Sequence, residues 1–171
     1  MYTQSYDPNL LYQGDVLKNI PFVLLPNSDL SVSTLDRQFE LDNLTKDFFG
    51  VKPKVVPSEF YSTTGMIISQ NCDIDNRNFI LCAPIFPISL RYPQNNQHVI
   101  QLKKQRVNYE MYLESNPEFN ESFVDLQLIS AVKQTIIKKE NRIAVLSVYG
   151  KSVLQQHLRD FLGRIETKDY I

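Results

Sequence analysis

Glycine and cysteine are scarce in this sequence, and each shortage excludes a class of site. Only five glycines occur in 171 residues, and they form no P-loop, nucleophile elbow or dinucleotide-binding turn. Enzymes built on those glycine motifs are therefore excluded. The two cysteines, Cys72 and Cys82, lie ten residues apart without a CxxC pair, a spacing that argues against a zinc site. We expect neither a metal nor a cofactor.

An excess of one charge and a long apolar run are also missing. The net charge is −1 and the isoelectric point is about 6.1, so a nucleic-acid partner would need a local basic patch. No apolar stretch approaches the roughly 20 residues that cross a bilayer. The first ten residues lack the basic and apolar regions of a signal peptide. We therefore expect a cytoplasmic protein without a membrane partner.

The composition that is present suits one folded domain. Apolar residues make up 43% of the chain and charged residues 22%, values typical of a globular protein with a real core. We expect an α+β, mainly β domain over 1–171. Its core should comprise 10–26, 64–90 and 122–163, with insertions at 27–63 and 91–121.

The centre of the chain predicts a hairpin. Two short apolar runs, 65–68 and 79–83, flank a polar stretch and are bounded by turn-forming residues, which is typical of buried strands. Four of the six residues over 71–76 are Asn or Asp, side chains that support turns by bonding nearby backbone. We expect strand, polar loop and strand, ended by Pro84.

The flanking segments predict further strands and a terminal helix. Apolar residues recur at steps of three and four after Ser147, a residue that can cap a helix, and Gly163 suggests a left-handed C-cap. The other expected elements are a strand at 22–25, an irregular 27–58 with a short amphipathic helix, an extended 85–90, a helix over about 100–114, and strands at 123–129, 131–137 and 142–146.

Several polar residues are candidates for chemistry. Cys72 lies beside Asp73 and Asp75, whose negative charges disfavour a thiolate nucleophile. Cys82 belongs to an apolar run and is expected in the core. His157 falls on the apolar stripe of the terminal helix and should be packed.

Two further features are less easily assigned to packing. His98 follows an Asn-rich loop and is a candidate functional group. Lys133, Lys138, Lys139 and Arg142 form the most basic segment. That segment is either a solvated turn or a rim that contacts phosphate.

The order of segments resembles the MazF/PemK toxin family. The residues that carry the likeness are 14–16 (Gly-Asp-Val) before an early strand, 66–69 (Met-Ile-Ile-Ser), 80–85 (Ile-Leu-Cys-Ala-Pro-Ile) and 143–147 before the terminal helix. The likeness covers 10–25, 64–88 and 122–163. It implies an SH3-like, partly open barrel with a C-terminal helix and an inserted segment.

The resemblance implies a dimeric, metal-independent endoribonuclease of a toxin–antitoxin or defence system, bound by an antitoxin or another protein. Thr64-Gly65 and Phe86 stand where the family has arginine-proline and a hydroxyl residue, so other residues must supply those groups. We predict a groove with Arg77, Asp73 and Cys72 as its catalytic residues. Arg77, Arg91, Asp15, Ser69 and Asn71 are predicted to bind the nucleic acid.

The missing arginine and hydroxyl leave a second hypothesis open. The chain would then be a non-catalytic protein-interaction module that retains the barrel without the ribonuclease chemistry. Its near-neutral charge and the irregular 27–58 segment are consistent with that role. A thiol or metal enzyme at Cys72 is a third hypothesis.

Overall fold

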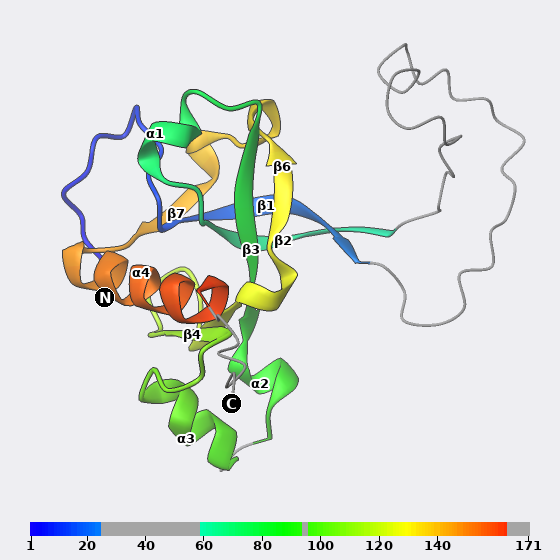
Figure 1. The fold of residues 1–171 in the computed structure, drawn as a ribbon, viewed down its shortest axis with the longest axis vertical. Coiled ribbons are helices and arrows are strands. Elements are labelled where there is room, and N and C mark those ends of the chain that lie inside the picture. Colours follow the sequence, from blue (N-terminus) through cyan, green and yellow to red (C-terminus); the bar gives the residue numbers. More distant parts are fainter. Residues whose placement is uncertain (25–58, 94–95, 164–171) are drawn as a thin grey trace, which may run out of the picture. The chain divides into compact units, whose positions relative to one another are not determined.

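The computed structural model describes residues 1–24, 59–93 and 96–163 (Figure 1). Contacts divide the chain into two units, one made of Met1–Phe22 with Tyr61–Ile171 and the other of Val23–Phe60. The predicted irregular segment 27–58, with its amphipathic helix, lies outside the described residues. The first unit contains every site considered below.

The elements alternate short strands with helical turns, which reflects the frequent prolines and Asn/Asp turns of the sequence. In chain order they are β1 (Asp15–Leu24), β2 (Glu59–Ile67), α1 (Asn71–Ile74), β3 (Phe79–Pro87), α2 (Ile88–Arg91), α3 (Gln97–Lys103), β4 (Glu110–Leu113), β5 (Ser122–Asp125), η1 (Leu126–Leu128), β6 (Ser130–Lys133), η2 (Gln134–Ile136), η3 (Lys139–Asn141), β7 (Arg142–Val145) and α4 (Val148–Leu162).

In residues 1–24, 59–93 and 96–163, seven strands form one antiparallel sheet that does not close. The order is β4-β5-β3-β2-β1-β7, and β6 pairs with β3 beside this path. β2 begins inside the predicted insertion 27–63, and β4 adds a strand from the predicted insertion 91–121. The predicted class, α+β and mainly β with a C-terminal helix, is confirmed, and the sheet is open; the SH3-like form of the predicted barrel stays a prediction.

The predicted central hairpin is confirmed as β2 and β3. Its second strand, β3, also pairs with β5 and β6. Gly65 lies opposite Pro84, and Ile67 lies opposite Cys82. The other edge of β3 is shared, because its first residues pair with β6 and its last three pair with β5. The polar connection is not wholly a loop, since 71–74 form the helical turn α1. Cys82 is fully buried, as predicted.

The predictions for 85–114 are wrong in two places. The extended segment ends at Pro87, where α2 begins, instead of continuing to residue 90. The helix expected over 100–114 stops at Lys103, and β4 follows it. Gln105 takes a left-handed backbone with φ 56°, which ends a helix. The apolar residues that suggested one long helix belong to two elements. Val99 and Leu102 have helical spacing within α3, whereas Met111 and Leu113 alternate along β4.

Two predicted strands are shorter than expected. β5 ends at Asp125, whose side chain accepts the backbone N–H of Gln127 and so begins the 3₁₀ turn η1. β6 ends at Lys133, where η2 replaces the strand predicted to residue 137. The strand predicted at 142–146 is confirmed as β7.

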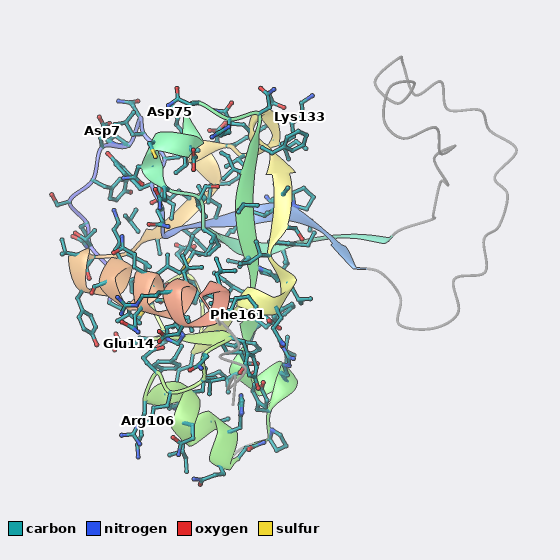
Figure 2. All side chains as sticks on the ribbon, in the orientation of Figure 1. Asp7, Asp75, Arg106, Glu114, Lys133 and Phe161 are labelled. Carbon is teal, nitrogen blue, oxygen red and sulfur yellow. The ribbon has the colours of Figure 1, made fainter. Side chains whose placement is uncertain are left out.

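The terminal helix α4 is confirmed, including its N-cap. The Ser147 hydroxyl accepts the Gly150 N–H at 3.2 Å. Leu154 is fully buried in a core cluster with Met66 and other residues of the strands, and Phe161 packs against that cluster from the last turn (Figure 2). The predicted left-handed cap is wrong, because Gly163 has φ −87° and simply continues the helical bonding to Arg159.

No described helix combines the length and the apolar composition needed to cross a bilayer.

Candidate functional site

Asp15 and Arg142, which we call the sealed pair, join β1 to β7. Arg142 Nη1 lies 2.9 Å from Asp15 Oδ2, and the two side chains are 4% and 0% exposed. The same oxygen accepts the Tyr12 N–H at 3.0 Å. Arg142 also donates to the carbonyls of Leu10 and Pro8. The guanidinium is therefore consumed by the protein itself.

Burial dominates the electrostatics of the sealed pair. It raises the pKa of Asp15, although the Tyr12 amide and Arg142 act in the opposite direction. Asp15 Oδ1 is buried and has no hydrogen-bond partner in the described part of the chain. In this environment Asp15 holds the first turn and cannot reach a nucleic acid.

Burial of Arg142 removes one cation from the basic segment that the sequence predicts as either a solvated turn or a phosphate-contacting rim. Lys133, Lys138 and Lys139 are exposed, and the Lys139 ammonium bonds the Asn9 carbonyl. Three exposed lysines stay available at this turn, whereas Arg142 does not.

Ser69 and Asn71 support the ends of the central hairpin. The Ser69 hydroxyl accepts the Leu81 N–H at 2.8 Å. Asn71 Oδ1 accepts the Gln13 N–H at 2.8 Å. The Asn71 bond joins the polar connection to the first turn, and the Ser69 bond joins its start to β3. Both side chains bond backbone groups of their own chain, so their visible role is structural.

The three predicted catalytic residues lie together on α1 and just after it. Cys72 is exposed, and its thiol lies 3.8 Å from Gln70 Oε1. Arg77 pairs with Asp73 at 3.3 Å on the surface. Residues 69–77 line none of the three pockets described below.

Arg77 and Arg91 do not share one phosphate site. They flank β3, which is nine residues long and therefore spans about 26 Å at roughly 3.3 Å per residue. Figure 1 shows α1 and α2 at opposite ends of this strand. The predicted groove edge is therefore divided between two places, and only Arg91 lies in a polar cluster with a pocket.

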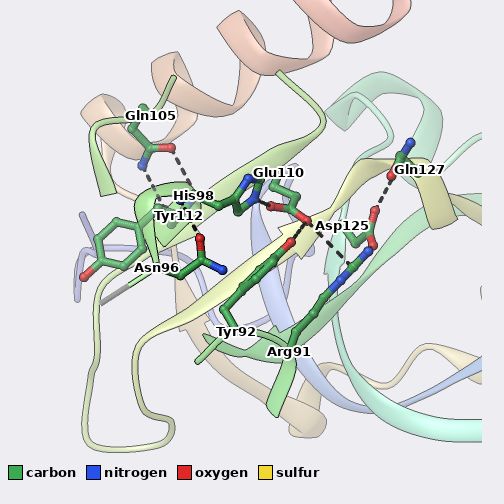
Figure 3. A network of polar contacts seen from close by, with 9 residues as sticks. All are labelled: Arg91, Tyr92, Asn96, His98, Gln105, Glu110, Tyr112, Asp125 and Gln127. Atoms are coloured by element: carbon green, nitrogen blue, oxygen red, sulfur yellow. Dashed lines mark hydrogen bonds and ion pairs between the residues drawn. The ribbon is translucent and has the colours of Figure 1, made fainter. Parts of the chain in front are cut away.

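That cluster, the Glu110 network, comprises Arg91, Tyr92, His98, Glu110 and Asp125 (Figure 3). The Tyr92 hydroxyl donates to Glu110 Oε1 at 2.5 Å, and His98 Nε2 lies 2.6 Å from Glu110 Oε2. Arg91 Nη1 lies 2.6 Å from Asp125 Oδ2 and 3.7 Å from Glu110 Oε1. Both carboxylates are buried, whereas the side chains of Arg91 and His98 are 43% and 27% exposed.

The sheet register creates the network. Glu110 on β4 lies directly opposite Asp125 on β5, and two like charges in that position repel. Arg91 at the end of α2 compensates both. α3 then brings His98 to Glu110, because Asn96 Oδ1 accepts the His98 N–H and so begins the helix there.

Protonation in the network follows from its partners. Burial tends to lower the pKa of Arg91, but the hydrogen bond and charges of Asp125 and Glu110 outweigh it and raise that pKa. Burial and the bond to Glu110 raise the pKa of Tyr92, so its hydroxyl is a neutral donor.

The same partners set the orientation of His98. The 2.6 Å contact of Nε2 with Glu110 Oε2 assigns a ring proton to Nε2, because a carboxylate oxygen is the usual acceptor in such a pair. Its Nδ1 has no hydrogen-bond partner among the described residues, and the side chain is 27% exposed. The ring therefore presents Nδ1 as its free nitrogen.

Two pockets are lined by residues of the Glu110 network. Arg91 and Asp125 line one of about 330 Å³, together with Phe86, Leu90 and two residues of η1. Tyr92 lines a larger one of about 710 Å³ between α2 and α3. A third, of about 340 Å³, lies beside α4 and includes His157.

His157 is packed, as predicted. Its Nε2 lies 3.0 Å from Gln105 Oε1, and burial lowers its pKa. Cys82 is likewise inert, because burial raises the pKa of its thiol to about 12. Within the described ranges, no three His, Cys, Asp or Glu residues are grouped to hold a metal ion.

Sequence reasoning selected Arg91 and flagged His98, but it missed Tyr92, Glu110 and Asp125. A usable signal was present for the two acids. Each lies in a short apolar run, and a charge buried by such a run needs a partner. Their actual partners could not be read from the chain.

No family model matches this chain, and no curated protein matches it.

Proposed function

We propose that this protein is a metal-independent endoribonuclease whose site is the Glu110 network. The observation that carries the proposal is the pairing of half-exposed His98 with fully buried Glu110 at 2.6 Å. A carboxylate that fixes one ring nitrogen leaves the other oriented as a general base. Arg91, bonded to the same carboxylate cluster, adds the cation.

The chemistry needs both groups at one phosphodiester. His98 Nδ1 takes the proton of a ribose 2′-hydroxyl, and the 2′-oxygen forms a bond to phosphorus. Guanidinium N–H groups of Arg91 stabilise the charge that develops on the phosphorane. The bond to the 5′-oxygen breaks, and water protonates that leaving oxygen. The products are a 2′,3′-cyclic phosphate and a 5′-hydroxyl.

The proposed activity is the one implied by the resemblance to MazF/PemK toxins, but the suppliers differ. Thr64 and Gly65 occupy the position of the family's arginine-proline, and Gly65 lies within β2. Arg91 replaces the arginine from another element. The net charge of the chain is −1, so RNA would be held by local contacts and its affinity should depend only modestly on salt.

Cleavage of mixed RNA in EDTA tests the proposal. The wild-type protein should release fragments with cyclic phosphate ends, and His98→Asn should slow cleavage by about 10²–10⁴-fold. His157→Asn is the matched control, since that histidine is packed away, and Arg77→Ala should also cleave normally. No cleavage by the wild type would overturn the proposal. Loss of cleavage in Arg77→Ala alone would return the site to 69–77.

A second candidate function is a protein-interaction module. It is favoured by Phe79 and Leu81, which lie two residues apart on β3 and are 58% and 44% exposed. Among the described strands β6 pairs only with β3, which leaves an edge for a second copy of the chain. Sedimentation should then show a dimer that Leu81→Lys converts to a monomer. A monomeric wild type would exclude this contact.

A further inference from the structure

The larger pocket combines apolar walls with a few polar groups, the composition of a small-molecule site. Its volume of about 710 Å³ falls within the range of roughly 300–1,000 Å³ typical of ligand sites. Ile88, Tyr92, Val99 and Ile100 supply the apolar surface. Ile100 is 44% exposed, so the pocket opens to solvent and could admit a planar ring.

One charged pair marks the polar wall. Lys103 Nζ lies 2.8 Å from both oxygens of Glu121. The Tyr112 hydroxyl donates to Glu121 Oε1 at 2.5 Å. The hydrogen bond from Lys103 has the largest effect on the pKa of Glu121 and lowers it, and the bond from Tyr112 lowers it further. The wall therefore presents a fixed carboxylate beside an ammonium group.

The pair can open for a ligand at little cost. The side chains of Lys103 and Glu121 are 43% and 44% exposed, and ion pairs of this kind contribute about 0–1 kcal/mol. Tyr112 would keep Glu121 in place while Lys103 moves aside. A ligand with two adjacent donors and a neighbouring acceptor would satisfy both groups better than they satisfy each other.

Among the RNA bases only guanine has that edge. Its N1–H and N2–H lie side by side and match the two carboxylate oxygens, while O6 accepts from an ammonium. On the same edge adenine presents one donor beside one acceptor, cytosine one donor followed by two acceptors, and uracil one donor between two acceptors, so none of them has two adjacent donors. We propose that the larger pocket binds the guanine base of the RNA substrate, with Glu121 on N1–H and N2–H, Lys103 on O6, and the ring against Tyr92. This inference rests on the proposed function, because it takes the substrate to be RNA.

Binding of guanosine and adenosine 5′-monophosphates by calorimetry tests the inference without requiring cleavage. The guanine nucleotide should bind at least tenfold more tightly. Glu121→Gln should remove that preference, because an amide cannot accept from both N–H groups. Glu118→Gln is the matched control, since Glu118 forms a similar exposed pair with Lys18 outside the pocket.

A second variant protects the test against loss of folding. Ile100→Trp fills the pocket from a half-exposed position and should abolish nucleotide binding at an unchanged melting temperature. Equal binding of both nucleotides, or binding unchanged in Glu121→Gln, would overturn the inference.

The two proposals fail separately. Guanine-selective nucleotide binding by a wild-type protein that cleaves no RNA would retain the pocket and reject the ribonuclease. Cleavage at sites without guanine, with no nucleotide bound, would reject the pocket and retain the ribonuclease.

Discussion

The sealed pair and the Glu110 network use the same chemistry in different surroundings. In each, a carboxylate on one strand meets a guanidinium near the neighbouring strand, at 2.9 Å for Asp15 and 2.6 Å for Asp125. Arg142 is 4% exposed, whereas Arg91 is 43% exposed. Arg142 also bonds backbone carbonyls of the N-terminal segment, while Arg91 contacts only side chains in the described bonds.

The difference separates a structural contact from a usable site. A guanidinium enclosed by protein acceptors stabilises the fold and cannot approach a phosphate. A guanidinium that is anchored by buried carboxylates but exposed on its other side can stabilise the fold and also bind a phosphate. Exposure of the cation, more than the charge of its partner, therefore decides which pair is a candidate for chemistry.

Removal of Arg142 should give the largest effect on stability. Arg142→Ala leaves the Asp15 carboxylate buried without its partner, and breaking such a pair costs about 3–5 kcal/mol. Urea unfolding followed by fluorescence or circular dichroism should show this loss at constant m-value. Lys138→Ala, a neighbouring exposed cation, should be neutral. A loss below about 1 kcal/mol would show that the pair is not sealed.

Removal of Arg91 should lower the free energy of unfolding by less than removal of Arg142. The difference between the two losses tests the contrast between the Glu110 network and the sealed pair. Glu110 keeps Tyr92 and His98 as donors, and Asp125 keeps the Gln127 N–H. Water can also enter where the half-exposed guanidinium was. Arg91→Ala should therefore lose about 1–2 kcal/mol, measured beside Arg142→Ala in the same urea series. Equal losses in the two variants would remove the distinction between the sites.

The sequence allowed the hairpin and the terminal helix to be predicted because each has one clear period. Apolar runs at 65–68 and 79–83 mark two strands, and steps of three and four mark α4. β4 was missed because Met111 and Leu113 continued the stripe of Val99 and Leu102 by coincidence. Short segments of different type can share an apolar pattern, and only the sheet register separates them.

The candidate site was less predictable than the fold. Arg91 could be selected by its charge, but its partner Asp125 is 34 residues away, and Asp15 is separated from Arg142 by 127. No local pattern encodes such pairings, because they depend on which strands become neighbours. For the same reason Arg77 looked equivalent to Arg91 in the chain, although they flank opposite ends of β3.

The turn that carries Asp15 should tolerate little change. Gly14 has φ +86°, and a Cβ there would lie 2.9 Å from the Leu146 side chain. Gly14→Ala should cost about 1–2 kcal/mol, because an L-residue is strained in this conformation. Thermal and urea unfolding should show that loss without any change in RNA cleavage. Reduced cleavage at full stability would connect the sealed pair to the site and contradict the comparison.

The buried histidine His157 extends the comparison to the pH dependence of stability. Burial lowers the pKa of His157, so the unfolded chain binds a proton at this residue before the folded protein does. Stability from this source is therefore fully present above about pH 6.5, the usual histidine value, and falls as the pH drops below it. Between pH 7.5 and 5.5 the loss should be about 1 kcal/mol or less in urea unfolding. His157→Asn should flatten that part of the profile, since an amide does not titrate. An equally steep profile in the variant would assign the pH dependence to other groups and leave the packed histidine without a measurable contribution.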